Sequence, residues 1–226
     1  MERPLAPPEP PLSDGVIVLR SWQRDDAAVL ALVFGSGDAK LAYWMDEVPQ
    51  PYTMADAVAY VDRSRAGWRG EVPATPFAIC DVVSADVLGW LGLTWDEARE
   101  GTVAAGYWTR LEARGRGVAP RALLLAAAWL FGDIGVERFE LRIDTRNEPS
   151  RRVAKKAGFT LDGIRRSARV NARDGRRFDE AIYSLLRHEL PPEEAGLTGR
   201  EWRASMKAAS NITDHLRADS DVNYRG

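Results

Sequence analysis

An apolar helix in the middle of the chain sets the first limit on its architecture. Residues 118–131 form an uninterrupted segment rich in alanine and leucine, with Pro120 where a first helical turn accepts proline and with Gly132 and Gly135 beyond its end. The helix that this segment predicts is apolar nearly all round, and such a helix must be covered on more than one face. The flanking segments are therefore expected to enclose it.

The order of the flanking segments indicates the fold class. Apolar and charged side chains alternate over 138–144, as in a half-buried strand, whereas Thr53 and Asn147 are suited to cap helices. In chain order we expect a strand at 16–20, helices at 25–34 and 53–68, strands at 76–83, 87–94 and 102–108, the apolar helix, a strand at 138–144, a helix at 147–157, and strands at 159–164 and 178–186. This order predicts an α+β fold with a central, mostly antiparallel mixed sheet of six or seven strands flanked by helices.

The two ends of the chain differ from this central part, which is expected to be one domain over 14–190. Five prolines within the first eleven residues predict a flexible arm over 1–13, because proline excludes a helix or a central strand. Trp202, Met206 and Ala209 share helical spacing and predict a helix over 198–216 in a C-terminal extension, 191–226, whose last ten residues are expected to be disordered. That helix would pack on its own domain or on a second subunit, so a homodimer and a monomer both stay open; a substrate lid is a further alternative.

Charge and hydropathy argue against two classes of partner. The chain has 226 residues, with 31 basic and 33 acidic side chains and a net charge of −2, which gives no basic surface for nucleic acid or an anionic membrane. The longest apolar run, 122–131, is half the length that crosses a bilayer, and the N-terminus lacks the pattern of a secretion signal. We expect a soluble, cytoplasmic protein.

Neither a metal site nor a nucleophilic cysteine is expected. Cys80 is the only cysteine, so no internal disulfide can form, and its place in a predicted buried strand indicates a small core residue. His188 and His215 stand alone, without the ligand spacing of a metal site.

The main candidate for a ligand site is the loop ahead of the apolar helix, formed by Arg114, Gly115, Arg116, Gly117, Val118 and Ala119. Glycine lets the backbone turn sharply and approach a ligand, and a helix start offers unpaired N–H groups and a positive dipole end. The loop therefore predicts an anion cradle suited to a pyrophosphate, with two arginines adding positive charge. A plain surface turn is the alternative.

The sequence of this loop does not match two other known phosphate-binding motifs. A Walker loop needs Gly-Lys-Ser or Gly-Lys-Thr at the helix start, and a dinucleotide fingerprint needs a third small residue that this loop lacks. The predicted order of strands is also wrong for a doubly wound fold. The ligand expected for this loop is therefore a coenzyme that has a pyrophosphate but no nicotinamide.

Three motifs then occur in a fixed order along the chain. The first is Arg114, Gly117 and Ala119; the second is Asn147, Ser150, Val153, Lys156, Gly158 and Phe159; the third is Gly106-Tyr107-Trp108, ahead of the loop. The first two resemble the signatures of the GNAT superfamily of acyl-CoA-dependent N-acetyltransferases, and the resemblance spans about 16–188. The third is similar to a strand in the branch that acetylates the N-termini of ribosomal proteins.

The resemblance implies a role for each part of the site. The strand that ends at Tyr107, Trp108 and Thr109 is expected to splay from the next strand and to bond the pantetheine arm of acetyl-CoA through its backbone. The amides of residues 116–119 are expected to hold the pyrophosphate, with Asn147 near the pantetheine. The alternative interpretation of Trp108 is that it is an ordinary aromatic residue of the core.

The resemblance also implies a direct transfer, without a covalent enzyme intermediate. Ser150 is the leading candidate to hydrogen bond the departing sulfur, and Tyr183 is a weaker candidate donor. The alternatives are an ordinary helix-start serine and a core tyrosine.

The general base cannot be assigned from the sequence. The ribosomal-protein branch carries a glutamate in the segment that corresponds to 167–170, where this chain has Ser-Ala-Arg-Val. Acidic residues are available at Asp96, Glu97, Glu100, Asp179 and Glu180, and a water chain is a further alternative.

The function expected from these features is transfer of an acetyl group from acetyl-CoA to a primary amine of a small molecule, such as an amino acid or an antibiotic, or of a peptide N-terminus. Transfer of another acyl group, such as succinyl, is one alternative. A non-catalytic acyl-CoA sensor is the other, because the family's glutamate is missing.

Overall fold

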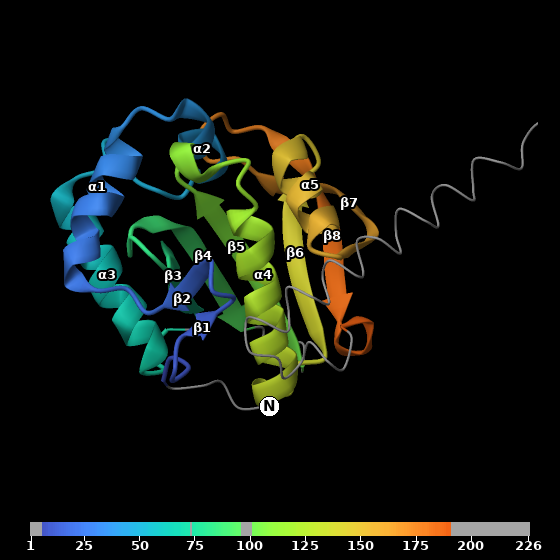
Figure 1. Ribbon diagram of the computed structural model, residues 1–226. Helices are drawn as coiled ribbons and strands as arrows, with labels where there is room; N and C mark the ends of the chain where they lie inside the picture. The colour runs from blue at the N-terminus through green and yellow to red at the C-terminus, as the bar shows by residue number, and fades with distance from the viewer. Residues whose placement is uncertain (1–5, 73, 96–100, 191–226) are drawn as a thin grey trace, which may run out of the picture.

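One eight-stranded sheet with helices on both faces forms the fold (Figure 1). The computed structural model describes residues 6–72, 74–95 and 101–190. The strands are β1 (Leu12–Ser13), β2 (Ile17–Arg20), β3 (Ala74–Asp81), β4 (Val87–Trp95), β5 (Thr102–Thr109), β6 (Arg138–Asp144), β7 (Thr160–Val170) and β8 (Arg177–Leu186). The helices are α1 (Ala27–Gly35), α2 (Ala39–Trp44), α3 (Met54–Trp68), α4 (Val118–Trp129) and α5 (Glu148–Lys156).

The sheet is mixed but almost entirely antiparallel. Its strands lie in the order β1-β2-β3-β4-β5-β6-β8-β7, and β5–β6 is the one parallel pair among them. The α+β class and the mostly antiparallel sheet predicted from the sequence are confirmed. The additional strand is β1, which pairs with β2 at the edge of the sheet and lies wholly within the arm predicted over 1–13.

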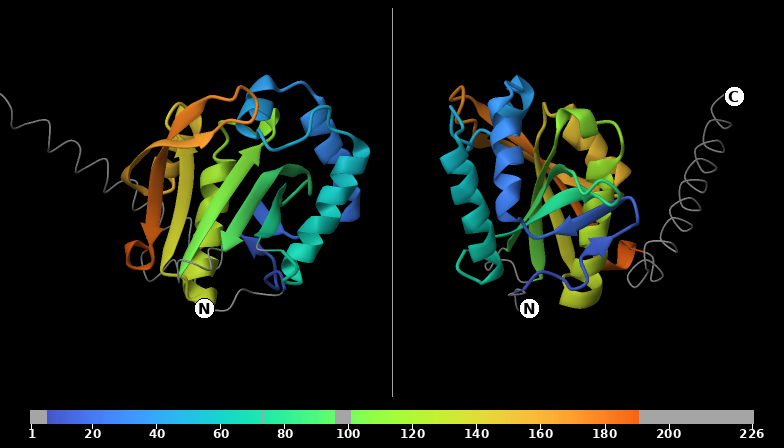
Figure 2. Two further views of the ribbon diagram at one scale, coloured as in Figure 1. Left: turned by 180° about the vertical axis from the view of Figure 1, so that it is seen from behind. Right: turned by 60° about the vertical axis from the view of Figure 1, so that its left-hand side comes forward.

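The two faces of the sheet carry separate apolar cores. Helices α4 and α5 cover one face, and α1 and α3 cover the other (Figure 2). Alternation along β3 divides its side chains between the two, because Phe77 and Ile79 belong to the core with α4 whereas Ala78 and Cys80 belong to the core with α1 and α3. A ligand that must touch both faces therefore has to pass through the sheet.

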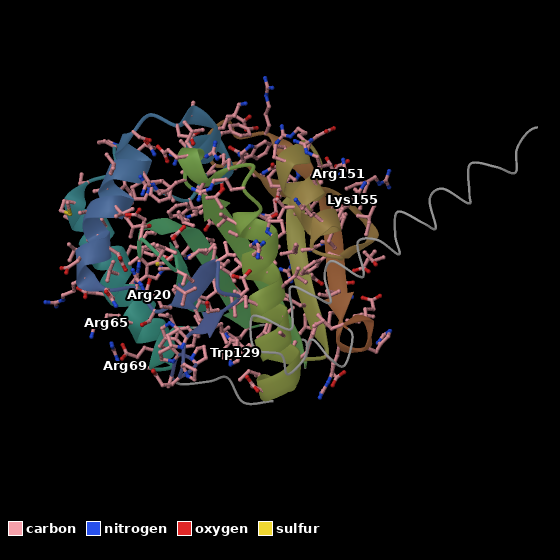
Figure 3. All side chains as sticks on the ribbon, viewed as in Figure 1. Arg20, Arg65, Arg69, Trp129, Arg151 and Lys155 are labelled. Carbon is pink, nitrogen blue, oxygen red and sulfur yellow. The ribbon has the colours of Figure 1, made fainter. Side chains whose placement is uncertain are left out.

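Helix α4 is the apolar helix that the sequence predicts. Its Ala122, Leu123 and Ala126 are completely buried against the sheet. Trp129 lies at its C-terminal end (Figure 3). The Trp129 ring packs edge-on against Phe77, with ring centroids 5.8 Å apart. The helix then continues as a π-helical turn, Leu130–Ile134. The burial expected from its all-round apolar surface is observed.

Two elements differ from the sequence prediction. Helix α2 was not predicted; it has six residues and is capped by Asp38, whose carboxylate accepts a hydrogen bond from the amide of Leu41. Strand β7 continues to Val170, six residues beyond the predicted end, although its side chains are almost all exposed and its register with β8 shifts twice. An exposed, bulged edge strand has no apolar alternation to reveal it.

Some predictions concern parts of the chain outside the described residues. These are the first residues of the arm, the helix expected over 198–216 with the tail after it, and the acidic residues Asp96, Glu97 and Glu100. Within the described part of the chain, no helix combines the length and the apolar character needed to cross a membrane.

Candidate active site

The site is organised by a gap between β5 and β6. The two strands pair in parallel only from Thr102 to Ala105, opposite Arg138 to Leu141. Beyond that point β5 continues to pair with β4 as far as Thr109, and β6 continues to pair with β8 as far as Asp144. Each strand stays with its antiparallel neighbour, so the two strands diverge. The splaying predicted for this strand is observed.

A cavity of about 650 Å³ passes through this gap. On the α4–α5 face it is lined by Tyr107, Asn147 and Ser150, and on the opposite face by Trp90 and Gly106 among others. Tyr107 packs against the core with α4, whereas Trp90 packs against the core with α1 and α3. The cavity therefore connects the two faces of the sheet, as a site that joins two reactants requires.

The loop ahead of α4 has the geometry of an anion cradle. Gly115 and Gly117 adopt left-handed backbone angles, with φ of +75° and +77°, which glycine accepts without strain. A Cβ at either position would meet no other atom within 4 Å, so the space above the backbone is open. Within the described residues, no well-formed hydrogen bond occupies the amides of residues 116–119. These amides fit the pyrophosphate of acetyl-CoA.

The two arginines of the loop point to different neighbours. Arg114 forms an ion pair with Asp38 at the start of α2, and its Nε donates to the carbonyl of Thr109 at 3.3 Å. Burial opposes ionisation of Asp38, but hydrogen bonds from the Leu41 amide and from Arg114 hold its pKa below the usual range. Arg116 is largely exposed and lies 3.9 Å from Asp81. Arg114 therefore braces the loop, and Arg116 is the arginine that a phosphate can reach.

The start of α5 brings the predicted polar residues together. Asn147 caps the helix, and its Oδ1 accepts a hydrogen bond from the amide of Ser150 at 3.2 Å. The Oγ of Ser150 lies 2.7 Å from the hydroxyl of Tyr107, which also lies 3.1 Å from the Ser150 carbonyl. Burial raises the pKa of Tyr107, so its hydroxyl keeps its proton at neutral pH. The tyrosine side chain is a polar partner of Ser150 that sequence reasoning missed.

Trp108 and Tyr183 are buried away from these hydroxyls. The Trp108 ring packs edge-on to Phe34, 5.4 Å between centroids, in the core with α1 and α3. Tyr183 is completely buried, its hydroxyl accepts a hydrogen bond from Arg151 at 3.3 Å, and it does not line the cavity. Only the backbone of Trp108 reaches the edge of the gap. The donor role of Tyr183 stays a prediction.

The wall opposite the cradle is aromatic and rests on glycines. Gly92 and Gly106 are cross-strand partners, and the Trp90 ring lies over both. A Cβ at Gly92 would lie 2.1 Å from a ring atom of Trp90, and one at Gly106 would lie 3.3 Å from it. A side chain at either position would push the indole towards the cavity.

The outer rim is built from the β7–β8 turn and from α2, a helix that no sequence motif indicated. Trp44 lines the cavity from α2, and Asn171 lines it from the β7–β8 turn. Asn171 donates to the carbonyl of Tyr43 at 3.2 Å, and Asp46 accepts from the amide of Ala172 at 2.7 Å. The capping Asp38 is the one sequence signal that could have revealed α2.

The described part of the chain shows no arrangement of side chains for metal-dependent catalysis or for a nucleophilic cysteine. No group of three or more histidine, cysteine, aspartate or glutamate residues could hold a metal ion there. His188 is exposed, and His215 lies outside the described residues. Burial raises the pKa of the Cys80 thiol to about 11, which suits a core residue and not a nucleophile.

The sequence of the chain is similar to those of known acetyltransferases. The chain matches the family described as the acetyltransferase (GNAT) domain over residues 17–160. It is 25% identical over 185 residues to a Bacillus subtilis (strain 168) protein named "Putative ribosomal N-acetyltransferase YdaF", covering 79% of this chain and 95% of that protein.

Two solved structures share the fold. One is Mycobacterium smegmatis RimJ in complex with CoA-disulfide, with a TM-score of 0.70, 23% identity, and coverage of 85% of this chain and 90% of that chain. The other is the microcin C7 self-immunity acetyltransferase MccE in complex with acetyl-CoA and AMP, with a TM-score of 0.65, 23% identity, and coverage of 76% and 92%.

Proposed function

Because the chain belongs to the acetyltransferase (GNAT) domain family, we propose that it transfers an acetyl group from acetyl-CoA directly to a primary amine. Acetyl-CoA is the acyl donor of this family and supplies an activated thioester. The acceptor in this proposal is a small molecule or a peptide N-terminus. The relative named as a putative ribosomal N-acetyltransferase supports the peptide N-terminus as acceptor.

The observation that carries the proposal is the cavity that crosses the sheet. A thioester held on the α4–α5 face and an amine held on the opposite face can meet only through an opening, and the gap after Ala105 is that opening. Holding both reactants in contact supplies much of the rate enhancement of such a direct transfer. No covalent enzyme intermediate is needed.

Each residue of the site has a role in the proposal. The amides of Arg116, Gly117, Val118 and Ala119 hold the pyrophosphate, and the open edge of β5 at Tyr107, Trp108 and Thr109 holds the pantetheine arm. Asn147 fixes the first turn of α5, so that Ser150 faces the cavity. The Oγ–H of Ser150 then donates a hydrogen bond to the sulfur, while Tyr107 donates to Ser150.

Calorimetric titration with acetyl-CoA, succinyl-CoA and NAD tests the binding half of the proposal. The wild-type protein should bind acetyl-CoA at micromolar strength and should not bind NAD. A double variant, Arg116→Ala with Gly117→Asp, should lose this binding, because an acidic side chain then occupies the cradle. A well-folded wild-type protein that binds no acyl-CoA would refute the proposal, and tighter binding of succinyl-CoA would redirect it to another acyl group.

Thiol release in the presence of amines tests the catalytic half. A protein that binds acetyl-CoA but releases no thiol with any amine of a broad panel would be an acyl-CoA sensor. Release that depends on the added amine, with mass spectrometry showing a gain of one acetyl group on that amine, is the result expected of an acetyltransferase.

A further inference from the structure

One buried carboxylate on the amine side of the cavity has no role in the site described so far. Glu180 lies on β8, lines the cavity and is only 2% exposed. Its neighbour Ala181 and the next alternate residue, Tyr183, belong to the core with α4, so Glu180 projects from the opposite face. In the β6–β8 ladder it stands opposite Asp144, three residues before Asn147. Glu180 therefore lies beside the gap, across the sheet from Ser150.

The other acidic residues that line the cavity are engaged elsewhere. Asp144 binds the guanidinium of Arg146, with contacts of 2.6 and 3.0 Å, and accepts from its amide at 2.8 Å. Asp46 accepts from the amide of Ala172, which ties α2 to the β7–β8 turn. The Glu47 side chain is 81% exposed and paired with Arg169. None of them combines burial with a carboxylate that can turn to a ligand.

Glu180 has a weaker protein partner than these. Among the described residues, its carboxylate meets one cation, Arg165 of β7, at 3.3 Å, and the Arg165 side chain is 55% exposed. A buried carboxylate is costly unless it is paired and hydrogen-bonded on its remaining lone pairs. An ammonium group in the cavity would supply both the charge and the donors.

We propose that Glu180 binds the acceptor as its ammonium ion and is the general base of the reaction; this inference rests on the proposed function. The carboxylate takes one proton from the ammonium, which leaves a neutral amine with a lone pair. The nitrogen forms a bond to the carbonyl carbon of the thioester, and the carbon–sulfur bond breaks. The second proton lost by nitrogen goes to the departing sulfur, so the products are the amide, the CoA thiol and a protonated Glu180 that returns its proton to solvent.

Both acidic and basic side chains surround Glu180, and their arrangement is compatible with a cationic acceptor. They are Arg165 on β7, Glu140, Arg142 and Asp144 on β6, Arg146 after β6, Arg169 near the end of β7, and Asp46 and Glu47 after α2. Arg142, Arg146 and Arg169 are each within ion-pair distance of a carboxylate other than that of Glu180. Arg165 shares Glu180 with the proposed ammonium, and Arg63 of α3 also lines the cavity.

Two probe peptides with amines of different basicity test the assignment. One is Ala-Phe-Ala amide, whose α-amine has a pKa of about 7.7–8.0, and the other is N-acetyl-Ala-Lys-Ala amide, whose side-chain amine has a pKa of about 10.4. Thiol release is measured with each peptide from pH 6.5 to 10 for the wild type, Glu180→Gln and Glu180→Asp. Acetyl-CoA affinity is measured for all three by calorimetry.

Glu180→Gln should lower kcat/KM by about 100-fold or more at pH 7, the usual contribution of a general base, and leave acetyl-CoA affinity within about twofold. The deficit should shrink above about pH 8 for the α-amine but persist to about pH 10 for the lysine amine, because solution then deprotonates each amine. Glu180→Asp should recover part of the activity. Asp179→Asn on the same strand, which keeps its acceptor oxygen for the Ser167 amide, is the matched control and should retain wild-type rates.

Three results would overturn the inference. Wild-type rates in Glu180→Gln would remove the residue from the reaction, and a deficit that does not follow the pKa of the amine would reduce it to a structural ion pair. A wild-type protein that binds acetyl-CoA but acetylates neither peptide would remove the ammonium site for both amine classes. Absence of acetyl-CoA binding, in contrast, would count against the proposed function itself.

Discussion

Replacing Gly117 by alanine tests whether the loop ahead of α4 holds acetyl-CoA through its backbone. The residue has φ of +77°, and a Cβ there meets nothing within 4 Å, so the change adds backbone strain without a steric clash. An alanine in the left-handed region costs about 1–2 kcal/mol relative to glycine. That energy must appear either in stability, if the loop keeps its shape, or in affinity, if the loop relaxes and its amides turn away.

The two possibilities predict linked changes in the dissociation constant of acetyl-CoA and in the free energy of unfolding. If the loop relaxes, the dissociation constant of acetyl-CoA should rise about 5- to 30-fold, because 1.4 kcal/mol corresponds to a factor of ten. If the loop holds, the free energy of unfolding should fall by about 1–2 kcal/mol instead. Calorimetric titration and urea unfolding, performed on the same preparation, measure both quantities, and their sum should account for the strain.

A matched glycine in another part of the chain provides the control. Gly175, in the turn between β7 and β8, has φ of +67° and the same open surroundings. Gly175→Ala should lower stability by a similar amount and leave acetyl-CoA affinity unchanged. If Gly117→Ala alters neither quantity, or if Gly175→Ala weakens acetyl-CoA equally, the cradle is not formed by the backbone of this loop.

Three further substitutions probe other parts of the site, and one chemical test probes the core. Ser150→Ala should lower kcat for thiol release by about 10- to 100-fold, the worth of a hydrogen bond to a charged group, with acetyl-CoA affinity nearly unchanged; a smaller loss is expected for Tyr107→Phe, which acts through Ser150. Gly92→Ala should raise KM for the amine but not the dissociation constant of acetyl-CoA, because the new Cβ displaces Trp90 on the amine side only. Cys80 should resist alkylation at pH 8, where a pKa of about 11 leaves about one thiolate per thousand molecules, and should react at once in urea. Burial favours the thiol, so its contribution to stability is complete below the unfolded pKa of about 8.5 and decreases as the pH rises towards 11.

The elements that the sequence predicted well are those with strong local signals. The start of α4 is marked by Gly117 and Pro120, and α5 by its capping Asn147, so both begin within one residue of the expected position. Strand β6 alternates apolar and charged residues and was predicted with its observed bounds. In each case the residues that fix the element lie inside it or next to it.

Only part of the cavity could be predicted from local sequence signals. The cradle and the α5 motif are each contained in a short stretch of sequence, and the sequence located them. The opposite wall instead joins Trp44, Trp90 and Glu180, which lie far apart along the chain and meet only through strand order and the β7–β8 turn. Glu180 was one of five acidic candidates in the sequence. Its burial distinguishes it from Asp179, the other of these candidates in the described part of the chain, and is a property of the folded sheet alone.

The position of the gap limits the number of backbone hydrogen bonds that the sheet loses. Opening a sheet between two apolar cores exposes backbone groups that must find other partners. The gap lies at the one parallel pair, where β5 and β6 each keep an antiparallel neighbour on the other side, so each strand loses bonds along a single edge. An amide-bearing pantetheine arm can satisfy the edge of β5 as an added strand would. In the proposed reaction, binding of the donor would complete the sheet, and the same opening would direct its thioester towards the face that carries Glu180.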